Sequence, residues 1–316
     1  MKEIVLGKSG IKVTELCFGA LPMGPAQKNM DVADSAEVVS EALLNGINFI
    51  DTAQIYRTYE PIRLAMKSTG IRPVIATKSP ALTYEDMEKS INEALSMLDV
   101  EYIDIFLLHA ARAELDVFDV RGEALRCLID YKNRGIITAV GISTHSVGVV
   151  SLAAEKPEID IVFPILNKLG MGILSGTLED MENAVEQCFK NDKGVYIMKA
   201  LAGGNLIHSY ADAVDYVRDF AAERAPVAIG MVSVDEVHAN INYFNGDEVN
   251  IQPIDTNTNK KFLIVPTLCK SCGKCIATCH SGVISMGENY AVIDNENCLC
   301  CGYCVTVCPQ FAIRMI

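Results

Sequence analysis

Short apolar runs rich in β-branched residues alternate with longer stretches of mixed polarity from about residue 15 to residue 246. There are eight such runs, namely ELCFGA, INFID, PVIATKS, YIDIFLLHA, ITAVGIS, DIVFPILN, GVYIMKA and APVAIGM. The stretches between them place apolar residues on one helix face, as in DVADSAEVVSEALLNG, where Ala36, Val39, Ala42 and Leu43 share a face and Gly46 ends the helix. Eight strand and helix units predict an α/β protein with a parallel (β/α)8 TIM barrel, a fold of about 250 residues.

A doubly wound open sheet is the competing fold for the same alternation. That fold normally has a glycine-rich phosphate loop, GxGxxG, after its first strand. Here the first run is followed by LPMGPAQ, which lacks the pattern, so the barrel is favoured. Residues 1–14 contain the turn GKSGIK between apolar runs and predict a hairpin that closes the bottom of the barrel.

The composition narrows the class of protein and of partner. Hydrophobic residues make up 50% of the 316 positions and charged residues 21%, which is ordinary for a compact globular chain. Lys and Arg number 27 against 40 Asp and Glu, and the net charge of −13 argues against a nucleic-acid partner. The opening MKEIVLGKSG lacks the apolar core of a signal peptide, and no run approaches the roughly 20 apolar residues of a membrane helix. We therefore expect a cytoplasmic protein without membrane insertion.

Cysteine marks the C-terminal tail as a separate chemical unit. Nine of the 12 cysteines lie between Cys269 and Cys308. In a chain without an export signal, dense cysteine at fixed spacing favours metal ligation over disulfides. The polar stretch QPIDTNTNKK precedes the tail and is interpreted as a linker. The predicted organisation is a barrel over residues 1–250, a linker over 251–261 and a small cysteine-rich domain over 262–316.

The tail repeats the spacing C-x₂-C-x₂-C-x₃-C twice, with Pro309 after the second repeat. Three thiolates of one tight loop reach three corners of an iron-sulfur cube, and the other repeat fills the fourth corner. The expected ligand sets are Cys269, Cys272, Cys275 and Cys308 for one cluster, and Cys298, Cys301, Cys304 and Cys279 for the other. Zinc is the alternative, although its structural sites usually take cysteines in separated pairs. The tail resembles the bacterial dicluster ferredoxin module, a small α+β fold with two [4Fe-4S] clusters.

Two positions depart from the ferredoxin pattern. His280 stands where the first repeat usually has proline, which we expect to affect only the local turn. Cys300 is an extra thiol, interpreted as a free thiol beside the cluster rather than a ligand. The isolated Cys17, Cys127 and Cys188 are expected to be buried apolar residues.

Polar residues end three consecutive apolar runs of the predicted barrel. INFID ends in Asp51, with Tyr56 in the loop that follows, VIATK ends in Lys78 and FLLHA carries His109. Function in such a barrel collects at the C-terminal ends of the strands, so these four side chains are expected to meet at one rim. Because an ammonium lowers the pKa of a neighbouring phenol, Lys78 is expected to lower the pKa of Tyr56, while Asp51 holds Lys78 charged and oriented. With His109 hydrogen-bonded to a carbonyl oxygen, the set suits reduction of a ketone or aldehyde, in which Tyr56 protonates that oxygen.

The segments GINFIDTAQIY, IATKS, IDIFLLHA and LGKSGIKVTELCFGA resemble the aldo-keto reductase family, and the resemblance spans residues 1–246. Asp51, Tyr56, Lys78 and His109 match the catalytic tetrad of that family. The resemblance implies an oxidoreductase that binds a nicotinamide cofactor, NAD(P)H, across the rim without a Rossmann motif. It also implies a small-molecule carbonyl substrate.

The family's cofactor site matches this chain only in part. Ser143 fits the serine that usually holds the carboxamide, but Thr144 replaces the usual asparagine. Phe163 stands where a glutamine is common, and Met198 stands where a tyrosine often stacks on the nicotinamide ring. The candidate cofactor-binding residues are Ser143, Thr144, Asn167, Met198, Leu201, Gly203, Gly204, Ser233, Glu236 and Asn240.

The loop after the eighth run bears on the choice of nucleotide. NADPH-preferring members of the family place Lys or Arg there, whereas this chain reads GMVSVDEVHAN, with Asp235 and Glu236. A carboxylate repels a 2′-phosphate but accepts a hydrogen bond from a ribose 2′-hydroxyl, so NADH is favoured over NADPH. Two alternatives stay open: backbone amides or Ser233 could hold either form, and nicotinamide binding could be weak altogether.

The two halves of the chain handle electrons differently. Clusters transfer single electrons and a nicotinamide transfers a hydride, so a carrier such as a flavin is needed to couple them, although no flavin motif is present. Three functions remain: a redox enzyme whose clusters pass electrons between a redox protein partner and the barrel, a plain NAD(P)H carbonyl reductase with structural clusters, and a non-enzymatic electron-transfer subunit. The intact tetrad argues against the third. No motif identifies the substrate, and the segment ARAELDVFDVRGEALRCLIDYKNRG, between the fourth and fifth runs, is short and unremarkable.

Overall fold

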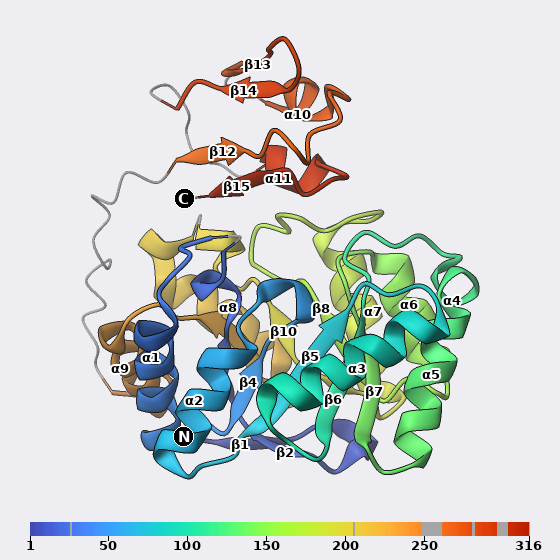
Figure 1. Ribbon diagram of the computed structural model, residues 1–316, viewed down its shortest axis with the longest axis vertical. Coiled ribbons are helices and arrows are strands. Elements are labelled where there is room, and N and C mark those ends of the chain that lie inside the picture. The colour runs from blue at the N-terminus through green and yellow to red at the C-terminus, as the bar shows by residue number, and fades with distance from the viewer. Residues whose placement is uncertain (26, 205, 248–260, 280–281, 296–302, 316) are drawn as a thin grey trace.

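The computed structural model describes residues 1–25, 27–204, 206–247, 261–279, 282–295 and 303–315. Figure 1 shows two bodies, a barrel and a smaller C-terminal module above it. The predicted linker over 251–261 lies, except for Lys261, outside the described residues. No described helix is both long enough and apolar enough to cross a membrane.

The barrel wall is a parallel sheet with the strand order β10-β11-β3-β4-β5-β6-β7-β8-β9. Its strands are β3 (Leu16–Gly19), β4 (Phe49–Asp51), β5 (Val74–Ser79), β6 (Ile103–His109), β7 (Ile137–Thr144), β8 (Ile161–Pro164), β9 (Gly194–Val195), β10 (Ile197–Met198) and β11 (Val227–Gly230). Because β9 pairs with β8 and β10 pairs with β11, these two short strands on either side of Tyr196 act as one interrupted strand. A bridge between Ile165 and Met198 completes the ring, and the predicted barrel is confirmed.

Successive side chains of each strand point to opposite faces of the sheet, so every strand supplies two layers of the core. Cys17, Phe49 and Leu107 belong to the inner cluster around the barrel axis. Their chain neighbours Phe18 and Ile50 belong to the outer cluster, which packs against the helices. Cys17, Cys127 and Cys188 are buried, as expected.

The helices surround this sheet. They are α1 (Val32–Leu44), α2 (Tyr59–Thr69), α3 (Tyr84–Leu98), α4 (Val117–Val120), α5 (Gly122–Asn133), α6 (Val147–Glu155), α7 (Leu178–Lys190), α8 (Tyr210–Ala221) and α9 (Val234–Asn245). Short 3₁₀ helices complete the barrel region: η1 (Gly7–Ser9), η2 (Leu21–Met23), η3 (Gln54–Tyr56), η4 (Ala202–Gly204) and η5 (Ile207–Ser209). α1 follows the predicted pattern, since Val39, Ala42 and Leu43 are buried on one face and the chain turns at Gly46 with φ +89°.

The first residues form the predicted hairpin. β1 (Glu3–Val5) pairs antiparallel with β2 (Lys12–Thr14), with Ile4 opposite Val13. Leu6 and Val13 are fully buried in the inner cluster of the barrel. In Figure 1 the hairpin lies at the end of the barrel away from the C-terminal module, so it closes the bottom.

The C-terminal module has its own small core. It contains β12 (Phe262–Ile264), α10 (Lys274–Thr278), β13 (Ile284–Met286), β14 (Ala291–Ile293), α11 (Tyr303–Val307) and β15 (Ile313–Met315). β12 pairs antiparallel with β15, and β13 with β14. Phe262, Ile264, Ile284 and Ile313 pack there around buried cysteines.

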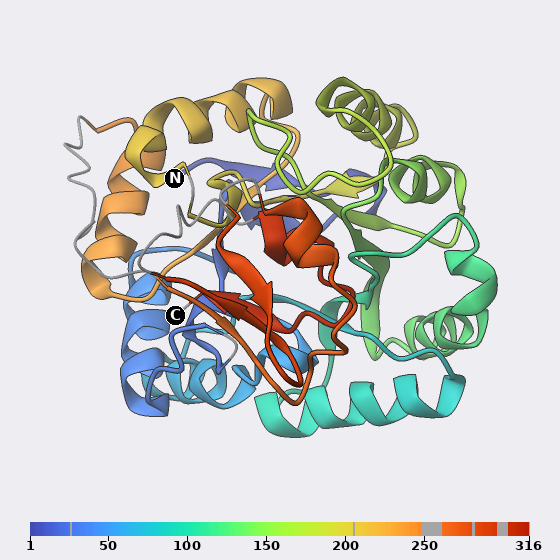
Figure 2. The same ribbon diagram turned by 90° about the horizontal axis from the view of Figure 1, so that it is seen from above.

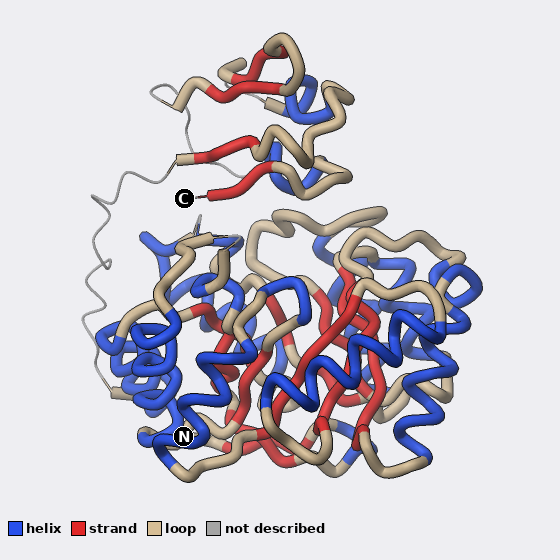
Figure 3. Tube along the Cα trace, in the orientation of Figure 1, coloured by secondary structure: helices blue, strands red, loops and turns tan. Residues whose placement is uncertain are grey.

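The module lies over the mouth of the barrel at the C-terminal ends of the strands. Seen from above in Figure 2, it covers the middle of the ring of helices. Figure 3 shows that loops form much of the rim that faces it. The contact is direct, because Arg112, in the loop after β6, donates a hydrogen bond from Nη2 to the carbonyl of Val305 in α11 at 2.7 Å.

Candidate functional site

The four predicted tetrad side chains come from neighbouring elements at the C-terminal rim. Asp51 ends β4, Lys78 lies near the end of β5 and His109 ends β6, and these three strands are adjacent in the sheet. Tyr56 ends η3, the turn that directly follows β4. The fold thus brings together residues that the sequence pattern had placed on one rim.

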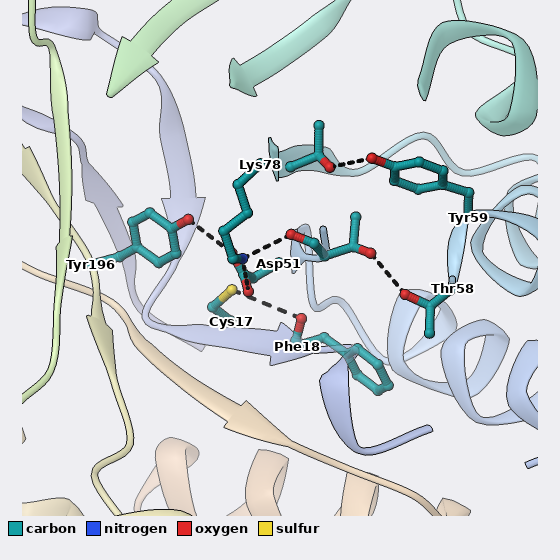
Figure 4. A network of polar contacts seen from close by, with 9 residues as sticks. Cys17, Phe18, Asp51, Thr58, Tyr59, Lys78 and Tyr196 are labelled. Carbon is teal, nitrogen blue, oxygen red and sulfur yellow. Dashed lines mark hydrogen bonds and ion pairs between the residues drawn. The ribbon is translucent and has the colours of Figure 1, made fainter. Parts of the chain in front are cut away.

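Asp51 and Lys78 form a buried ion pair, shown in Figure 4. The Lys78 ammonium donates to both carboxylate oxygens of Asp51 at 2.7 Å and to the carbonyl of Thr52 at 2.8 Å. Burial raises the pKa of Asp51 and lowers the pKa of Lys78, and the attraction between the two charges opposes both shifts. All three N–H groups of Lys78 are therefore bound to Asp51 and Thr52.

Tyr196 is a further member of this network that the sequence pattern did not single out. Its hydroxyl donates to Asp51 Oδ1 at 2.9 Å (Figure 4). Its ring stacks on Phe163 with centroids 3.8 Å apart. Tyr196 interrupts the seventh strand of the barrel and faces its axis. The sequence feature that could have pointed to it is a tyrosine at an inward position of the run GVYIMKA. Asp51 is thereby held by donors from two strands.

The loop that carries Tyr56 is held by hydrogen bonds on both sides. Thr52 and Thr58 share a bond of 2.7 Å between their hydroxyls, and Tyr59 and Thr77 share another of 2.7 Å (Figure 4). Gln54 in η3 accepts a hydrogen bond from Ser79 at 2.9 Å. These contacts fix the turn between β4 and α2, and with it the position of Tyr56.

Tyr56 faces His109 and lies over Lys78. The Tyr56 and His109 rings meet edge to face with centroids 5.8 Å apart, and Lys78 Nζ lies 4.9 Å from the centre of the Tyr56 ring. Burial raises the pKa of Tyr56 well above its usual value, and the charge of Asp51 raises it further. The expected lowering of this pKa by Lys78 is wrong for this structure, because every N–H of Lys78 is bound elsewhere and Asp51 offsets its charge. Tyr56 is consequently protonated across the neutral range.

His109 is an uncharged member of the site. Burial lowers its pKa well below the usual value, with a further lowering by the positive charges of Lys78, Arg121 and Lys199. Its Nδ1 atom is buried and has no hydrogen-bond partner among the described residues. A neutral imidazole has one N–H to donate, which is what a carbonyl oxygen requires.

Three of the candidate cofactor residues have side chains engaged within the protein. The Asn167 amide binds its own loop, donating to the Met171 carbonyl at 2.9 Å. Asn240 accepts a hydrogen bond from Tyr210 and donates to the Glu236 carbonyl at 2.7 Å. The Glu236 carboxylate accepts from the Val232 N–H at 2.7 Å. Their contacts to a nucleotide stay predictions.

The other candidate cofactor residues lie on the same rim. Ser143 and Thr144 are buried at the end of β7, and Ser143 pairs in register with Phe163 of β8. Met198 ends β10. Leu201, Gly203 and Gly204 follow in the turn around η4, where both glycines have positive φ.

An open cleft of about 460 Å³ lies beside the start of α9. Ser233 lines it together with Lys28, Asp34 and Glu37. Lys28 comes from the loop after β3, and the sequence pattern did not assign it to the nucleotide site. One cation, two carboxylates and a hydroxyl therefore line this cleft.

One cavity of the module is lined by all four cysteines of the first predicted ligand set, Cys269, Cys272, Cys275 and Cys308. The Ser271 N–H points at Cys269 Sγ at 3.4 Å, and the Ala312 N–H at Cys308 Sγ at 3.3 Å. Four thiols with backbone donors at two sulfurs fit an iron-sulfur cluster. No three His, Cys, Asp or Glu side chains of the described ranges are grouped to hold a single metal ion.

Of the second predicted ligand set, only part is described. Cys279 is partly buried and Cys304 is buried in the module. Cys298 and Cys301 lie outside the described residues, as do His280 and Cys300.

Arg112 gives the segment after β6 a role that the sequence did not predict. Besides its bond to Val305, its guanidinium lies 5.0 Å from the centre of the Phe311 ring in the module. This segment, unremarkable in the sequence, therefore connects His109 to a module contact within three residues. The sequence feature that could have predicted this role is a basic residue only three positions after His109.

Comparison with known proteins agrees with this architecture. The profile of the Aldo/keto reductase family matches residues 15–223, more than half of the chain, and the profile of the 4Fe-4S dicluster domain matches residues 268–312. The chain belongs to the aldo/keto reductase family and carries a 4Fe-4S dicluster domain after its barrel. Both resemblances seen in the sequence are confirmed.

The similar curated proteins match part of the chain. L-galactose dehydrogenase of Arabidopsis thaliana is 28% identical over 191 residues, which are 56% of this chain and 59% of that protein. The 6-dehydroglucose reductase of Novosphingobium aromaticivorans is 29% identical over 182 residues, 49% of this chain and 58% of its own. One component of an ion-translocating oxidoreductase complex from Methanosarcina acetivorans is 47% identical over 47 residues, 15% of this chain and 18% of that protein. The chain thus spans less than two thirds of the length of these relatives.

Solved structures share the fold. The holo form of an aldo-keto reductase from Bacillus halodurans superimposes with a TM-score of 0.66 at 20% identity, covering 80% of this chain and 94% of that one. An aldo-keto reductase structure from Pseudomonas aeruginosa gives 0.65 at 22% identity, covering 77% and 94%. At these identities the likeness concerns the fold.

Proposed function

We propose that the protein is an NAD(P)H-dependent reductase of a small carbonyl compound, whose iron-sulfur module transfers electrons to or from the barrel site or a redox protein partner. The observation that carries the first part is Tyr56, protonated and facing neutral His109 above the Asp51–Lys78 pair. Family membership and relatives named as a dehydrogenase and a reductase support reductive chemistry at this rim.

Each tetrad residue has a role that follows from its contacts. Bound nicotinamide supplies the hydride for the carbonyl carbon. Tyr56 donates its hydroxyl proton to the carbonyl oxygen, and His109 donates a hydrogen bond to the same oxygen. The Asp51–Lys78 pair supports the Tyr56 ring from below, and Tyr196 keeps Asp51 oriented.

The nucleotide is proposed to lie across the rim. Ser143, Thr144 and Met198 would flank the nicotinamide end, and the turn from Leu201 to Gly204 the diphosphate. The cleft beside Ser233 would take the adenosine end. NADH stays the favoured form because of Asp235 and Glu236, although Lys28 in the same cleft is a cation that a 2′-phosphate could use. A flavin as relay stays a proposal without a residue assigned to it.

The second part of the proposal concerns the module. Its location over the barrel mouth and the Arg112 contact beside His109 support electron exchange with the barrel site. The alternatives are structural clusters on a plain carbonyl reductase, and an electron-transfer subunit without catalysis.

Replacing Tyr56 tests the reductase. Since general acid catalysis contributes at least about 100-fold, Tyr56→Phe should lower kcat for aldehyde reduction by at least about that factor. Tyr102→Phe, at an exposed tyrosine before β6, is the matched control and should keep the wild-type rate. An unchanged rate in Tyr56→Phe, with iron content equal to wild type, would contradict the proposal.

The visible spectrum of protein purified without oxygen tests the module. Bleaching of the cluster absorbance by NADH or NADPH would support electronic coupling to the barrel, and a flavin band would name the relay. Bleaching by dithionite alone would favour structural clusters or a protein electron donor.

A further inference from the structure

Five basic side chains, with His109 among them, gather on the barrel rim. His109 ends β6, Arg112 and Arg121 lie in the segment after it, His145 follows β7 and Lys199 follows β10. His109 pairs in register with Ser143, two residues before His145, and the His145 N–H donates to the Ala111 carbonyl at 3.0 Å. The loops after β6 and β7 are thus joined where these residues lie. We call these five side chains the basic rim set.

The charges of this set act on one another. Burial is the main cause that lowers the pKa of His145, followed by the charges of Lys199 and Arg112. Burial, followed by Arg112, lowers the pKa of Lys199 to about 8. Lys199 also lowers the pKa of His109. Such mutual effects require that the groups share one poorly solvated region.

Among the described residues, no acidic group compensates the set. Neither an ion pair nor a side-chain hydrogen bond within these ranges joins His109, Arg121, His145 or Lys199 to a carboxylate. Asp51, beneath them, is already occupied by Lys78 and Tyr196. Arg121 Nη1 and His109 Nδ1 are buried and unpartnered in the part of the chain that the structure describes. Because their pKa values are lowered, His109 and His145 are uncharged, and the positive charge of the set lies on the two arginines and Lys199. A partly buried positive group without a partner is costly, and this chain has 40 acidic residues from which a partner could have come.

We propose that the basic rim set binds an anionic group, a carboxylate or a phosphate, on the carbonyl substrate itself. The substrate class is then an anionic aldehyde or ketone, such as an oxo acid. This inference rests on the proposed function, since it names the substrate class of the same site.

The position of the set favours the substrate over two other anions. Three of the five residues lie on the segment that begins with His109, which faces Tyr56. His145 and Lys199 border the residues proposed for the nicotinamide and the diphosphate, so the measurement of NADH binding below separates the substrate from the cofactor. Arg112 is held by the module, since it donates to the Val305 carbonyl and lies 5.0 Å from the centre of the Phe311 ring. Among the described residues, no hydrogen bond or ring contact joins Arg121, His145 or Lys199 to the module, so the module accounts for Arg112 alone. Arg121 Nη1 and His109 Nδ1 are themselves shielded from water, which strengthens a hydrogen bond from either atom to a bound anion.

A matched pair of substrates tests this. The ratio of kcat/KM for 4-carboxybenzaldehyde to that for its methyl ester is measured on the holoprotein with NADH at low ionic strength. We expect the acid to be favoured by about tenfold or more, and each of Lys199→Met and Arg121→Gln to lower this ratio by about tenfold through a higher KM for the acid. Arg126→Gln is the control, because Arg126 is an exposed arginine five residues further on, paired with Glu123, and it should keep the ratio. Competition by inorganic phosphate or by acetate then separates a phosphate site from a carboxylate site.

Two kinetic results would overturn the inference. The first is an acid-to-ester ratio near one in the wild-type protein, or a ratio that the two variants leave unchanged. The second is weaker NADH binding by the variants at an unchanged ratio, which would assign the charges to the cofactor's diphosphate.

A binding measurement keeps this inference separate from the reductase proposal. Thermal stabilisation of the Tyr56→Phe holoprotein by benzoate is compared with that by benzamide, which is similar in shape and uncharged. A larger shift with benzoate that is lost in Lys199→Met supports the anion site even if neither aldehyde is reduced. Equal shifts, including no shift with either, would overturn it.

Discussion

The Lys78 ammonium uses all of its N–H groups inside the barrel, two on Asp51 and one on Thr52. Lys78 therefore contacts Tyr56 through the ring, with Nζ 4.9 Å from the ring centre. The nearby charge of Asp51 offsets the effect of the ammonium on the pKa of Tyr56. The sequence predicted that the four tetrad candidates lie together but gave the wrong direction for the shift in the pKa of Tyr56. Motif spacing says which groups meet, whereas burial and the remaining hydrogen-bonding capacity decide how each one titrates.

Lys199 gives a prediction at the same scale. Its pKa is lowered from 10.5 to about 8 by burial and by Arg112, so between these pH values the unfolded chain holds a proton that the folded protein has lost. Stability should then rise with pH across this window. Lys199→Met removes the buried charge and should stabilise the protein at neutral pH by on the order of 1–3 kcal/mol, a gain that fades toward pH 10.5.

Differential scanning calorimetry of the substrate-free holoprotein at several pH values checks this. Lys67→Met, at an exposed lysine of α2, is the control and should leave the difference from wild type independent of pH in this window. A Lys199→Met protein that is less stable than wild type at neutral pH would contradict the prediction. Positive φ at residue 199 does not confuse the comparison, because lysine and methionine both carry a Cβ.

Among the secondary-structure elements, β7 and β8 approach each other so closely that one position must be glycine. A Cβ added to Gly141 would lie 2.0 Å from the Ile161 carbonyl oxygen and 2.7 Å from Leu107 Cδ2. Gly141 pairs in register with Ile161 and is followed by Ser143 at the rim. The sequence placed this glycine in a strand, but the reason for it is a contact with a residue 20 positions away.

Gly141→Ala should therefore displace β8 and lower the melting temperature sharply, by several degrees or more, in line with overpacking penalties of about 1–3 kcal/mol. Gly122→Ala is the matched control: nothing lies within 4 Å of its added Cβ, and it begins α5, so a small gain in stability is expected. Circular dichroism melts of both variants decide the matter. Equal melting temperatures for the two would show that the strands adjust freely.

At the scale of the whole molecule, the module covers the barrel mouth, and α11 lies on the side of the module that faces the barrel. Among the described residues, Arg112 makes the hydrogen bond between the two. The barrel has its own core and the module has a separate small one. Among the described residues, Arg112 joins the two through a hydrogen bond and a ring contact, so this one side chain should affect the position of the module.

Arg112→Gln should loosen the module without unfolding it. We expect faster amide exchange in α11 (Tyr303–Val307) and in the loop after His109, because both lose the bond between Arg112 and Val305. The β13–β14 hairpin, which does not take part in this contact, serves as an internal reference. Hydrogen–deuterium exchange with mass spectrometry measures this, with Arg126→Gln as the matched control. Unchanged exchange in α11 would show that other contacts seat the module.

Residue order was enough to predict the elements, the barrel, the hairpin below it, the meeting of the four tetrad candidates at one rim and the cysteine spacing of the tail. These are local properties, since side-chain periodicity and motif spacing depend on residues close together in the chain. Three features emerged only in the folded molecule: Tyr196 holds Asp51, Lys78 has no proton left for Tyr56, and basic residues from three loops converge without an acid among the described residues. Each of these features depends on which strands lie side by side and on which side chains are shielded from water. Both are set by contacts between residues far apart in the chain, so no single segment of the sequence predicts them.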